Sequence, residues 1–555
     1  MSADLTSRDA TGTTPADMAL AGWGDPARRT GLPEHALTWL RKEVGPGRPS
    51  LPAPVTATPG RLPDDVRAAL AAAVGAAHVV TDDATRLLHA AGKSYLDLVR
   101  LRAGGEVAAP DAVVLPATAE EVAAVLRLCA QHAVAVVPFG GGTSVVGGVS
   151  PLRGRFAAVV ALDLRRLDRL LSVDQDSLTA VFQPGVRGPA AERLLQSHGL
   201  TLGHFPQSYE HASIGGYAAT RSAGQASSGY GRFDDLVVSL VVQTPAGELR
   251  LGRGAASAAG PDLRSLVVGS EGAFGVITEV ELKVRRRPET QRFEGAFFRS
   301  WAEGTAALRE LEQTGLAPDV LRLSDPDETR VHLALAGTGG LKGRAGRAFL
   351  RARGYGQGCL AVLGWDGPTD EVARRRSAAL GVVRRHGGQA VGASVGERWA
   401  HGRFDGPYLR DDLLDAGVLV ETLETSATWT RLPQTRDAVR TALTASLSGS
   451  GTGPGPVVMC HVSHVYPHGA SLYFTVLARQ SDTDPVGQWQ RAKDAACAAI
   501  VATGATITHH HAVGTDHRTH LVDEVGALGV EVLRAVKAVL DPAGVLNPGK
   551  LLPEA

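Results

Sequence analysis

The sequence predicts an α+β fold with two unlike domains and a helical layer at the N-terminus. Between residues 106 and 287, strands alternate with helices and with three glycine-rich segments. After Pro288, long helices are separated by strands in a pattern typical of helices that cross a mostly antiparallel sheet. The chain has 555 residues. Because single hydrophobic cores stop growing at about 250–300 residues, it needs more than one domain.

We expect five segments along the chain. They are a disordered tail at 1–20, a helical region at 21–105, an α/β domain at 106–287, a second α+β domain at 288–505, and a C-terminal segment at 506–555 that returns to the first domain.

Three helices are predicted in the N-terminal region. Pro33–Val44 opens with a proline, which the first turn of a helix accepts. Asp64–Val74 and Asp82–Leu101 follow, and leucines together with Tyr95 give the last of these an apolar face. These helices make up the expected N-terminal layer.

The α/β domain opens with a strand, a helix and a second strand. Val113–Pro116 is a short strand, and the capping box Thr118–Glu121 begins a helix that ends near His132. The continuous apolar run Ala133–Val137 is typical of a buried strand and leads into the glycine-rich segment Pro138–Gly148.

The segment Pro138–Gly148 is predicted to bind a phosphate. Glycines accept positive φ, so that successive backbone N–H groups can converge on an anion, and Thr143 and Ser144 can add hydroxyl donors. Neither common nucleotide motif fits, because no Gly-Lys-Ser/Thr follows and Val145 stands at the third glycine position of G-x-G-x-x-G. The alternative is a surface turn without a ligand.

The composition favours a globular protein that acts on a small molecule. Lysine plus arginine equals aspartate plus glutamate at 57 each, so no global field attracts nucleic acid. The four cysteines contain no C-x-x-C pair, which argues against a disulfide framework or a zinc site. No secretory signal or membrane-spanning stretch is evident, and we expect a cytoplasmic protein.

The run His509, His510, His511 is the sharpest local signal for catalysis, because imidazole can transfer protons near neutral pH. If the preceding residues end a strand, alternation puts His509 and His511 on one side and His510 on the other. We expect no metal, since no spacing supplies the further ligands that zinc needs. The alternatives are fortuitous metal binding and a solvated polar loop.

Four other side chains are candidates that also have structural interpretations. Tyr473 lies in an apolar strand, where a tyrosine is commonly a core residue. Arg410 precedes two aspartates and suits a surface ion pair. Arg322 stands between two leucines and needs a buried anion or a path to water. His204 follows a glycine and is commonly a loop residue.

Several segments spread over almost the whole chain resemble one flavoenzyme family. The segments are Gly22–Gly24, Gly203–Ser208, Gly215–Gly231 with Asp234–Val238, Val320–Leu323, Tyr408–Asp411, Leu423–Trp429, Gly469–Phe474 and His509–Gly514. They resemble the alkyldihydroxyacetonephosphate synthase family. Residues 106–287, with about 540–553, resemble the PCMH-type FAD-binding domain of the vanillyl-alcohol oxidase superfamily, which implies two subdomains and, at 288–505, a substrate-binding cap.

The resemblance implies non-covalent FAD. Superfamily members that tether FAD through the glycine loop have a histidine where Thr143 stands. The cofactor-binding residues implied are Pro138, Gly140, Gly141, Gly142, Thr143, Ser144, Pro206, Gln207, Ser208, Ser213, Gly216, Thr220, Ser222, Ala223, Gly224, Gln225, Glu271, Gly272, Gly275, Val276 and Ile277.

The family's reaction exchanges the acyl chain of acyl-dihydroxyacetone phosphate for a long-chain alcohol, in ether-lipid synthesis. The resemblance implies that a base deprotonates the carbon bearing the ester, that flavin N5 bonds to this carbon as the carboxylate leaves, and that the alcohol then displaces the flavin. It implies Tyr473 and the histidine run as proton handlers. It implies substrate binding by Arg410, Arg322, His204 and Thr425.

The chief rival function is an FAD-dependent 2-hydroxy-acid dehydrogenase or oxidase of the D-lactate or glycolate type, which shares the flavin domain and the ending Asn547–Lys550. The triple histidine, the Arg410 segment and Glu424–Ser426 favour the synthase. A flavin-binding protein without catalysis is the third alternative. We expect a homodimer, and the basic segment Lys342–Arg353 is either a contact with anionic lipid or a solvated loop.

Overall fold

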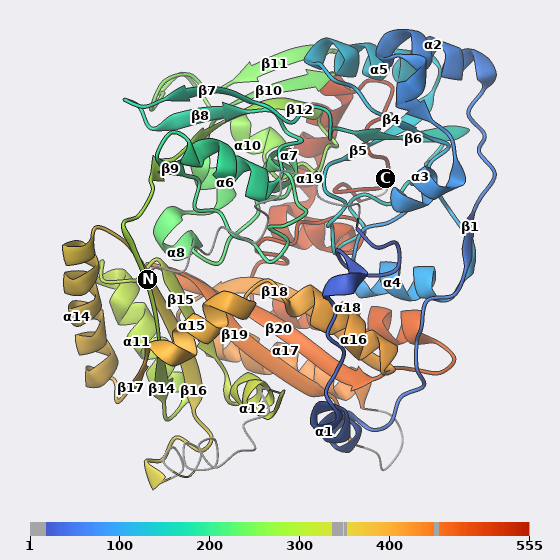
Figure 1. Cartoon of the computed structure of the whole chain (residues 1–555). Helices are drawn as coiled ribbons and strands as arrows, with labels where there is room; N and C mark the ends of the chain where they lie inside the picture. Colours follow the sequence, from blue (N-terminus) through green and yellow to red (C-terminus); the bar gives the residue numbers. More distant parts are fainter. Residues whose placement is uncertain (1–17, 336–347, 349–351, 449–453, 554–555) are drawn as a thin grey trace.

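A computed structural model describes residues 18–335, 348, 352–448 and 454–553. Most of the predicted N-terminal tail, of the loop at 448–456 and of the basic segment 342–353 lies outside the described residues. Figure 1 shows two sheets of the first half of the chain at the top of the molecule and a long sheet of the second half at the bottom. The predicted α+β fold is confirmed.

A four-stranded and a five-stranded sheet build most of the first half, which also has two two-stranded sheets. The four-stranded sheet has the strand order β2-β4-β6-β5, in which β4, β6 and β5 run parallel, and the five-stranded sheet is antiparallel with the order β11-β10-β12-β8-β7. The bounds are β2 (Val79–Val80), β4 (Ala112–Val114), β5 (Val134–Phe139), β6 (Ala158–Asp163), β7 (Leu170–Asp174), β8 (Thr179–Phe182), β10 (Val237–Thr244), β11 (Gly247–Leu251) and β12 (Val276–Lys283). β5 and β6 are apolar at nearly every position because both of their faces are buried.

Two helices cover one face of the four-stranded sheet, namely α2 (Asp64–Val74) and α5 (Ala119–Gln131). Leu70 of α2 and Leu126 of α5 lie in the same hydrophobic cluster as Val136 and Val160 of the sheet. The Thr118 hydroxyl caps α5 by accepting the N–H of Glu121. This packing holds β5 rigid up to the residue where the glycine loop begins.

The single helix predicted at 82–101 is wrong. The structure has two helices in its place, α3 (Asp83–Leu88) and α4 (Tyr95–Arg102). The chain breaks because it passes the glycine loop too closely for a side chain: a Cβ at Gly92 would lie 2.2 Å from the carbonyl oxygen of Ser144. The Lys93 N–H donates to the same oxygen at 2.6 Å, and Ser94 then caps α4.

A seven-stranded antiparallel sheet forms the second half. Its strand order is β17-β14-β16-β15-β19-β20-β18. The bounds are β14 (Thr290–Phe298), β15 (Val320–Ser324), β16 (Cys359–Gly367), β17 (Gln389–Gly392), β18 (Val418–Thr428), β19 (Val457–Tyr466) and β20 (Gly469–Arg479). Because strand side chains alternate, Leu472 and Phe474 of β20 join the core on one face, whereas Tyr473 and Thr475 line a cavity on the other.

Helices pack on both faces of this sheet. Core residues come from α11 (Trp301–Gln313), α14 (Thr369–Arg385), α17 (Leu432–Leu447) and α18 (Pro485–Ala502), among other helices. Those that contribute to the cavity are α12 (Pro326–Leu335), α15 (Ala393–Gly402) and α16 (Gly406–Asp415).

The remaining elements are short or peripheral, apart from the long last helix. They are α1 (Glu34–Val44), α6 (Gly188–Gln196), α7 (Ile214–Thr220), α8 (Ser227–Tyr230), α9 (Phe233–Leu236), α10 (Arg264–Val267), α19 (Leu521–Leu540), β1 (Val55–Ala57), β3 (Gly105–Val107), β9 (Leu200–Thr201) and β13 (Arg285–Arg286). The last helix, α19, is kinked at Gly526, where φ is +74°.

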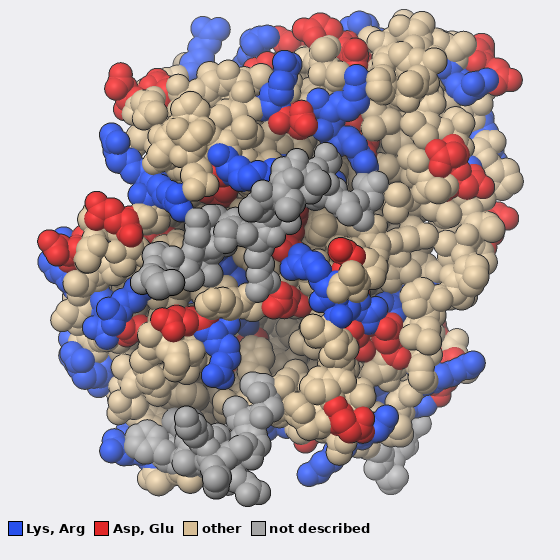
Figure 2. All heavy atoms as spheres, viewed as in Figure 1, with Lys and Arg blue, Asp and Glu red and all other residues tan. Residues whose placement is uncertain are grey.

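The charged surface is mixed. On the face drawn in Figure 2, basic and acidic side chains are interspersed over both halves of the molecule, in keeping with the equal totals of 57. Nucleic acid is held by a continuous basic surface, which this face does not offer. Of the helices that the structure describes, none combines the length and the apolar character needed to cross a bilayer.

Candidate active site

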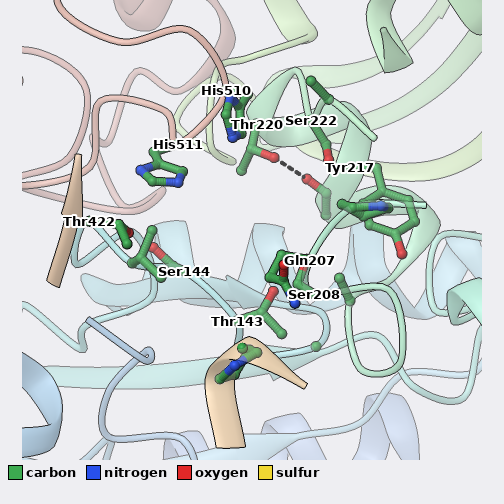
Figure 3. Close-up of a pocket in the computed structure, with 18 of the residues that line it drawn as sticks. Thr143, Ser144, Gln207, Ser208, Tyr217, Thr220, Ser222, Thr422, His510 and His511 are labelled. Carbon is green, nitrogen blue, oxygen red and sulfur yellow. Dashed lines mark hydrogen bonds between the residues drawn. The ribbon is translucent and has the colours of Figure 1, made fainter. Parts of the chain in front are cut away.

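A cavity of about 540 Å³ lies between the two halves of the molecule. Its walls come from the glycine loop after β5, from α7, from the residues before β12 and from one face of the seven-stranded sheet. Figure 3 shows His510 and His511 on one side of this space and Thr143, Gln207 and Ser208 on the other. The cavity therefore joins the predicted cofactor-binding and catalytic segments.

The glycine loop has the shape of an anion cradle. A Cβ at Gly140 would lie 2.4 Å from Ser213 Oγ, and a Cβ at Gly141 would lie 2.1 Å from the carbonyl oxygen of His211. Gly142 has a φ of +66°. Among the described residues, the backbone N–H groups of 141–144 donate to no protein acceptor, so they are available to a pyrophosphate. The loop therefore fits FAD.

Nearly all predicted cofactor-binding residues line the cavity. They are Pro138, Gly140, Gly141, Gly142, Thr143, Ser144, Pro206, Gln207, Ser208, Ser213, Gly216, Thr220, Ser222, Ala223, Gln225, Glu271, Gly272, Gly275, Val276 and Ile277. Gly224 lies just behind the wall, where a Cβ would come within 2.7 Å of the Phe205 nitrogen. The individual contacts of these residues with FAD stay predictions.

Glu271 connects the cofactor side of the cavity to the end of the chain. Its carboxylate accepts the N–H groups of Val513 and Gly514 at 2.8–3.1 Å, and its carbonyl oxygen accepts Asn547 Nδ2 at 2.7 Å. Burial raises the pKa of Glu271 to about 7 in spite of the backbone donors. The segment after α19 thereby returns to the glycine loop.

Tyr473 is the centre of an aromatic cluster on the cap side. Its ring stacks on those of His461 and His510, with centroid separations of 4.9 and 5.8 Å, and His511 meets it edge-on at 5.5 Å. Burial raises the pKa of Tyr473 to about 12, although a hydrogen bond with Thr422 opposes the rise. The phenol is therefore protonated at neutral pH and can donate to a ligand.

Glu424 gives the histidine run its shape. Its buried carboxylate accepts the N–H groups of His509, His510 and His511 at 2.6, 3.1 and 2.9 Å, together with the Thr508 hydroxyl at 2.6 Å. Three consecutive N–H groups that reach one carboxylate form a loop, so the strand alternation predicted here is wrong. His510 and His511 both line the cavity, whereas His509 does not.

The histidines at the cavity are neutral near pH 7. Burial lowers the pKa of His510 and of His511 to about 4 each, although the Glu424 charge raises both. Burial raises the pKa of Glu424, but the neighbouring imidazoles and the Thr508 hydroxyl outweigh it and hold that pKa well below its usual value. A neutral imidazole beside a carboxylate can accept a proton and is stabilised once charged.

Arg410 presents hydrogen-bond donors that the described protein does not use. Its Nη1 donates to the carbonyl oxygen of Lys93 at 2.5 Å, whereas its Nε and Nη2 are buried without a hydrogen-bond partner among the described residues. Asp411 lies 3.7 Å from Nη2 and accepts the Trp23 N–H at 2.6 Å. Because Arg410 lines the cavity, an anionic ligand group there would satisfy its free N–H groups.

Arg322 also lines the cavity, but its guanidinium is paired. Nη2 donates to Glu328 Oε1 at 2.8 Å and lies 3.1 Å from His461 Nδ1, which itself lies 3.0 Å from the same Glu328 oxygen. The buried anion that a strand arginine needs is therefore a residue of α12. A ligand would meet an ion pair here and not a free guanidinium.

His204 and Thr425 lie one layer behind the cavity wall. His204 Nε2 is 3.1 Å from Ser222 Oγ, and its ring packs on Tyr217 and another aromatic ring. The Thr425 hydroxyl donates to the carbonyl oxygen of Thr506, at the start of the histidine loop. We assign neither of the two a direct contact with substrate.

Six charged or histidine residues of the cavity wall escaped the sequence analysis, namely Glu328, His332, Arg403, Glu421, His461 and His464. His461 and His464 stand in the largely apolar strand β19, and this pattern is a signal that could have found them, because a buried imidazole needs a partner. Arg403 lies over two phenylalanine rings and Glu421 accepts the Thr422 N–H, and neither has a local signal in the sequence.

Comparisons with known proteins place the chain among the FAD-linked oxidases. The family model for the FAD binding domain matches residues 110–252, and the one for the C-terminal domain of FAD linked oxidases matches residues 287–551. Alkyldihydroxyacetonephosphate synthase of Dictyostelium discoideum is 33% identical over 481 residues, which cover 85% of this chain and 78% of that protein. The enzyme of Trypanosoma brucei brucei is 34% identical with the same coverage.

Solved structures agree with these matches. An alkyldihydroxyacetonephosphate synthase structure has a TM-score of 0.82 at 28% identity and covers 96% of this chain and 98% of that one. P-cresol methylhydroxylase, with a TM-score of 0.67 at 16% identity over 88% of this chain and 96% of that one, shares the fold. The chain is thus an enzyme that uses FAD as its cofactor. It belongs to the alkyldihydroxyacetonephosphate synthase family.

Proposed function

We propose that the protein exchanges the acyl chain of acyl-dihydroxyacetone phosphate for a long-chain alcohol, as in ether-lipid synthesis. One observation carries the proposal: the buried Nε and Nη2 of Arg410 have no acceptor among the described residues, in the cavity that also holds Tyr473, His510 and His511. A phosphate headgroup would satisfy these donors and present the ester to the proton-handling groups.

The remaining cap wall suits a hydrocarbon chain. Apolar side chains that line the cavity here are Val331, Leu335, Trp399, Leu409, Leu413, Met459 and Leu477. A site with one anion-binding end and an apolar wall matches a substrate with a phosphate head and a long tail.

The side chains divide the work. His510 or His511, which are neutral, would take the proton from the carbon that bears the ester. The Tyr473 phenol, which keeps its proton at neutral pH, would donate a hydrogen bond to the departing carboxylate. The bound flavin would supply N5 as the atom that holds the substrate carbon until the alcohol attacks, without net oxidation or reduction.

The test is a product analysis without an electron acceptor. We would incubate the FAD-loaded protein with palmitoyl-dihydroxyacetone phosphate and hexadecanol and measure both products by mass spectrometry. We expect hexadecyl-dihydroxyacetone phosphate and an equal amount of palmitate. If no alkyl product forms, and D-lactate or glycolate reduces an added dye instead, the enzyme is a 2-hydroxy-acid dehydrogenase and the proposal fails.

We also propose a cytoplasmic homodimer that contacts membranes peripherally. The exposed apolar side chains Leu528, Val532 and Val539, four and seven residues apart on α19 after its kink at Gly526, support a contact with a second copy. Light scattering should report a dimer for the wild type and a monomer for Leu528→Glu.

Flotation with anionic liposomes tests the membrane contact. It should weaken when the arginines of 342–353 become glutamines, and unchanged flotation would discard the membrane contact.

A further inference from the structure

Three side chains form a hydrogen-bonded line that leads away from the cavity. His510 lines the cavity, and its Nδ1 lies 2.9 Å from Nδ1 of His509. His509 is only 6% exposed and does not reach the cavity, and its Nε2 lies 2.6 Å from the hydroxyl of Tyr466. The line therefore connects a cavity residue, through a buried ring, to the end of β19.

The geometry of this line couples the tautomers of the two histidines. A neutral imidazole carries one proton on its two nitrogens, so a hydrogen bond between two Nδ1 atoms needs one protonated and one bare Nδ1. When His510 has the Nδ1 proton, its Nε2 is a proton acceptor and His509 Nε2–H donates to Tyr466. When His509 has it, His510 Nε2–H is a proton donor and Tyr466 donates to His509.

We propose that His510, His509 and Tyr466 form a proton relay between the cavity and the protein surface. A proton bound at His510 Nε2 displaces the Nδ1 proton onto His509 Nδ1. The Nε2 proton of His509 then passes to the Tyr466 oxygen, which releases its own proton outward. Only N–H and O–H bonds form and break, and no electrons are exchanged. His509 and Tyr466 are positioning residues that act through His510.

The relay rests on the proposed function, which requires a proton to leave. The alcohol gives up its hydroxyl proton, and the fatty acid departs as a carboxylate because the pKa of a carboxyl group, about 4, is far below neutral pH. One proton per turnover must therefore leave the cavity. The relay exports this proton, and both histidines are neutral before and after the transfer.

The surroundings keep the inner part of the line neutral. Burial lowers the pKa of His509 well below its usual value and that of His510 to about 4. The titratable and charged groups that face the line are Glu424, His461, His464, His468, His511, Tyr473, Arg232, Asp234 and Asp235. Because both rings are neutral, the two tautomeric arrangements carry the same net charge.

The outer end of the line is open to solvent through a charged pair. Burial raises the pKa of Tyr466, and the guanidinium of Arg232 opposes that rise. Arg232 pairs with Asp234 at 3.0 Å, and their side chains are 20% and 26% exposed. A proton released by Tyr466 therefore emerges beside a carboxylate in contact with water.

The first test is spectroscopic and needs no substrate. We would record 15N spectra of the FAD-loaded protein labelled at histidine, assigned with His509→Gln and His510→Gln. Tyr466→Phe removes the hydroxyl and should shift the Nδ1 signals of His509 and His510 in opposite directions. The matched control is Tyr355→Phe, whose hydroxyl donates to the Gly387 carbonyl oxygen away from the cavity, and it should leave both signals unchanged.

The second test is kinetic. Tyr466→Phe should lower kcat about 100-fold, at the low end of general acid–base effects, while KM stays within about twofold. The remaining kcat of Tyr466→Phe should rise with the concentration of a small buffer such as imidazole, which can carry the proton in place of the relay. Tyr355→Phe should show neither the loss nor the buffer dependence.

Two results would overturn the relay. One is a Tyr466→Phe protein with the 15N signals and kcat of the wild type. The other is a metal ion in the purified protein that shifts the signals of His464, His509 and His510 on removal, since their ring nitrogens lie within 4.8 Å of one another. If the wild-type protein forms no alkyl product, the proposed function is wrong. The 15N experiment still shows in that case whether the tautomers of His509 and His510 are coupled.

Discussion

The two walls of the cavity recognise their ligands by different means. The wall of the FAD-binding half is made of backbone, with glycines packed so closely that a Cβ at Gly141 would lie 2.1 Å from a carbonyl oxygen. The cap wall combines apolar residues with mostly buried polar side chains such as Tyr473, His510 and Arg410, each oriented by a partner or left with free donors. Shape therefore sets cofactor binding, whereas charge and proton position set the chemistry.

The largest effect is expected from a substitution in the backbone wall of the FAD-binding half. In Gly141→Ala the new methyl group meets the His211 carbonyl oxygen, so the loop has to move and the cradle of N–H groups is lost. We expect purified protein without FAD, measured as loss of the flavin absorbance band. Gly381→Ala in α14, where a Cβ meets nothing nearer than 3.8 Å, is the matched control and should keep full FAD. Full FAD in Gly141→Ala would contradict the cradle.

The next effect separates chemistry from cofactor binding. Tyr473→Phe keeps the ring that stacks on His461 and His510 but removes the phenol proton. We expect exchange to fall about 100- to 10,000-fold, as when a general acid–base group is lost, with FAD content unchanged. Product analysis and the flavin spectrum measure the two quantities, and retained turnover would remove Tyr473 from the mechanism.

A smaller effect concerns the substrate headgroup. Arg410→Gln removes a guanidinium whose Nε and Nη2 have no acceptor among the described residues, and we expect kcat/KM to fall about 10- to 150-fold, mainly through KM, as for the loss of a charge-assisted hydrogen bond. Arg440→Gln, which removes an ion pair to Asp327, is the control. An unchanged KM for the phosphate substrate would show that the headgroup does not bind at Arg410.

The smallest expected effect is on stability in acid. The free energy of unfolding should fall as the pH falls because of histidines in the cap wall. The pKa of His510 and His511 is about 4 in the folded protein, against about 6.5 in the unfolded chain. The unfolded chain therefore takes up protons first as the pH falls. Each of the two histidines stabilises the fold fully above pH ~6.5, and this contribution is lost towards pH ~4 at about 1.4 kcal/mol per pH unit. Urea unfolding at pH 7.5 and 5.5 measures this, and equal midpoints would contradict the neutral histidines.

The backbone wall was largely predictable from sequence because its signals are local. A buried apolar strand that runs into consecutive glycines indicates an anion loop wherever it occurs, and the capping box at Thr118 fixes the preceding helix. The sequence pattern missed the break between α3 and α4 because the apolar period continues across it. Gly92 and the capping box Ser94–Asp97 were local signals of the break, and the close approach of the chain to Ser144, which is distant in sequence, accompanies it.

The cap wall was predictable only as a set of residue types. Nothing near His510 in the sequence shows that Glu424, on β18, gathers three consecutive N–H groups and sends two histidines into the cavity. Likewise, the anion required by Arg322 could be inferred, but its identity as Glu328 depends on how α12 packs. Such pairings are tertiary contacts, and the periodicity of the sequence does not predict them.

The most direct test of the account follows the flavin itself under anaerobic conditions. The FAD-loaded protein would receive palmitoyl-dihydroxyacetone phosphate without alcohol, and the flavin spectrum and the released palmitate would be recorded together. The account predicts bleaching with one palmitate per flavin and recovery of the yellow colour on addition of hexadecanol. A flavin that stays yellow with the lipid but is reduced by D-lactate would contradict it.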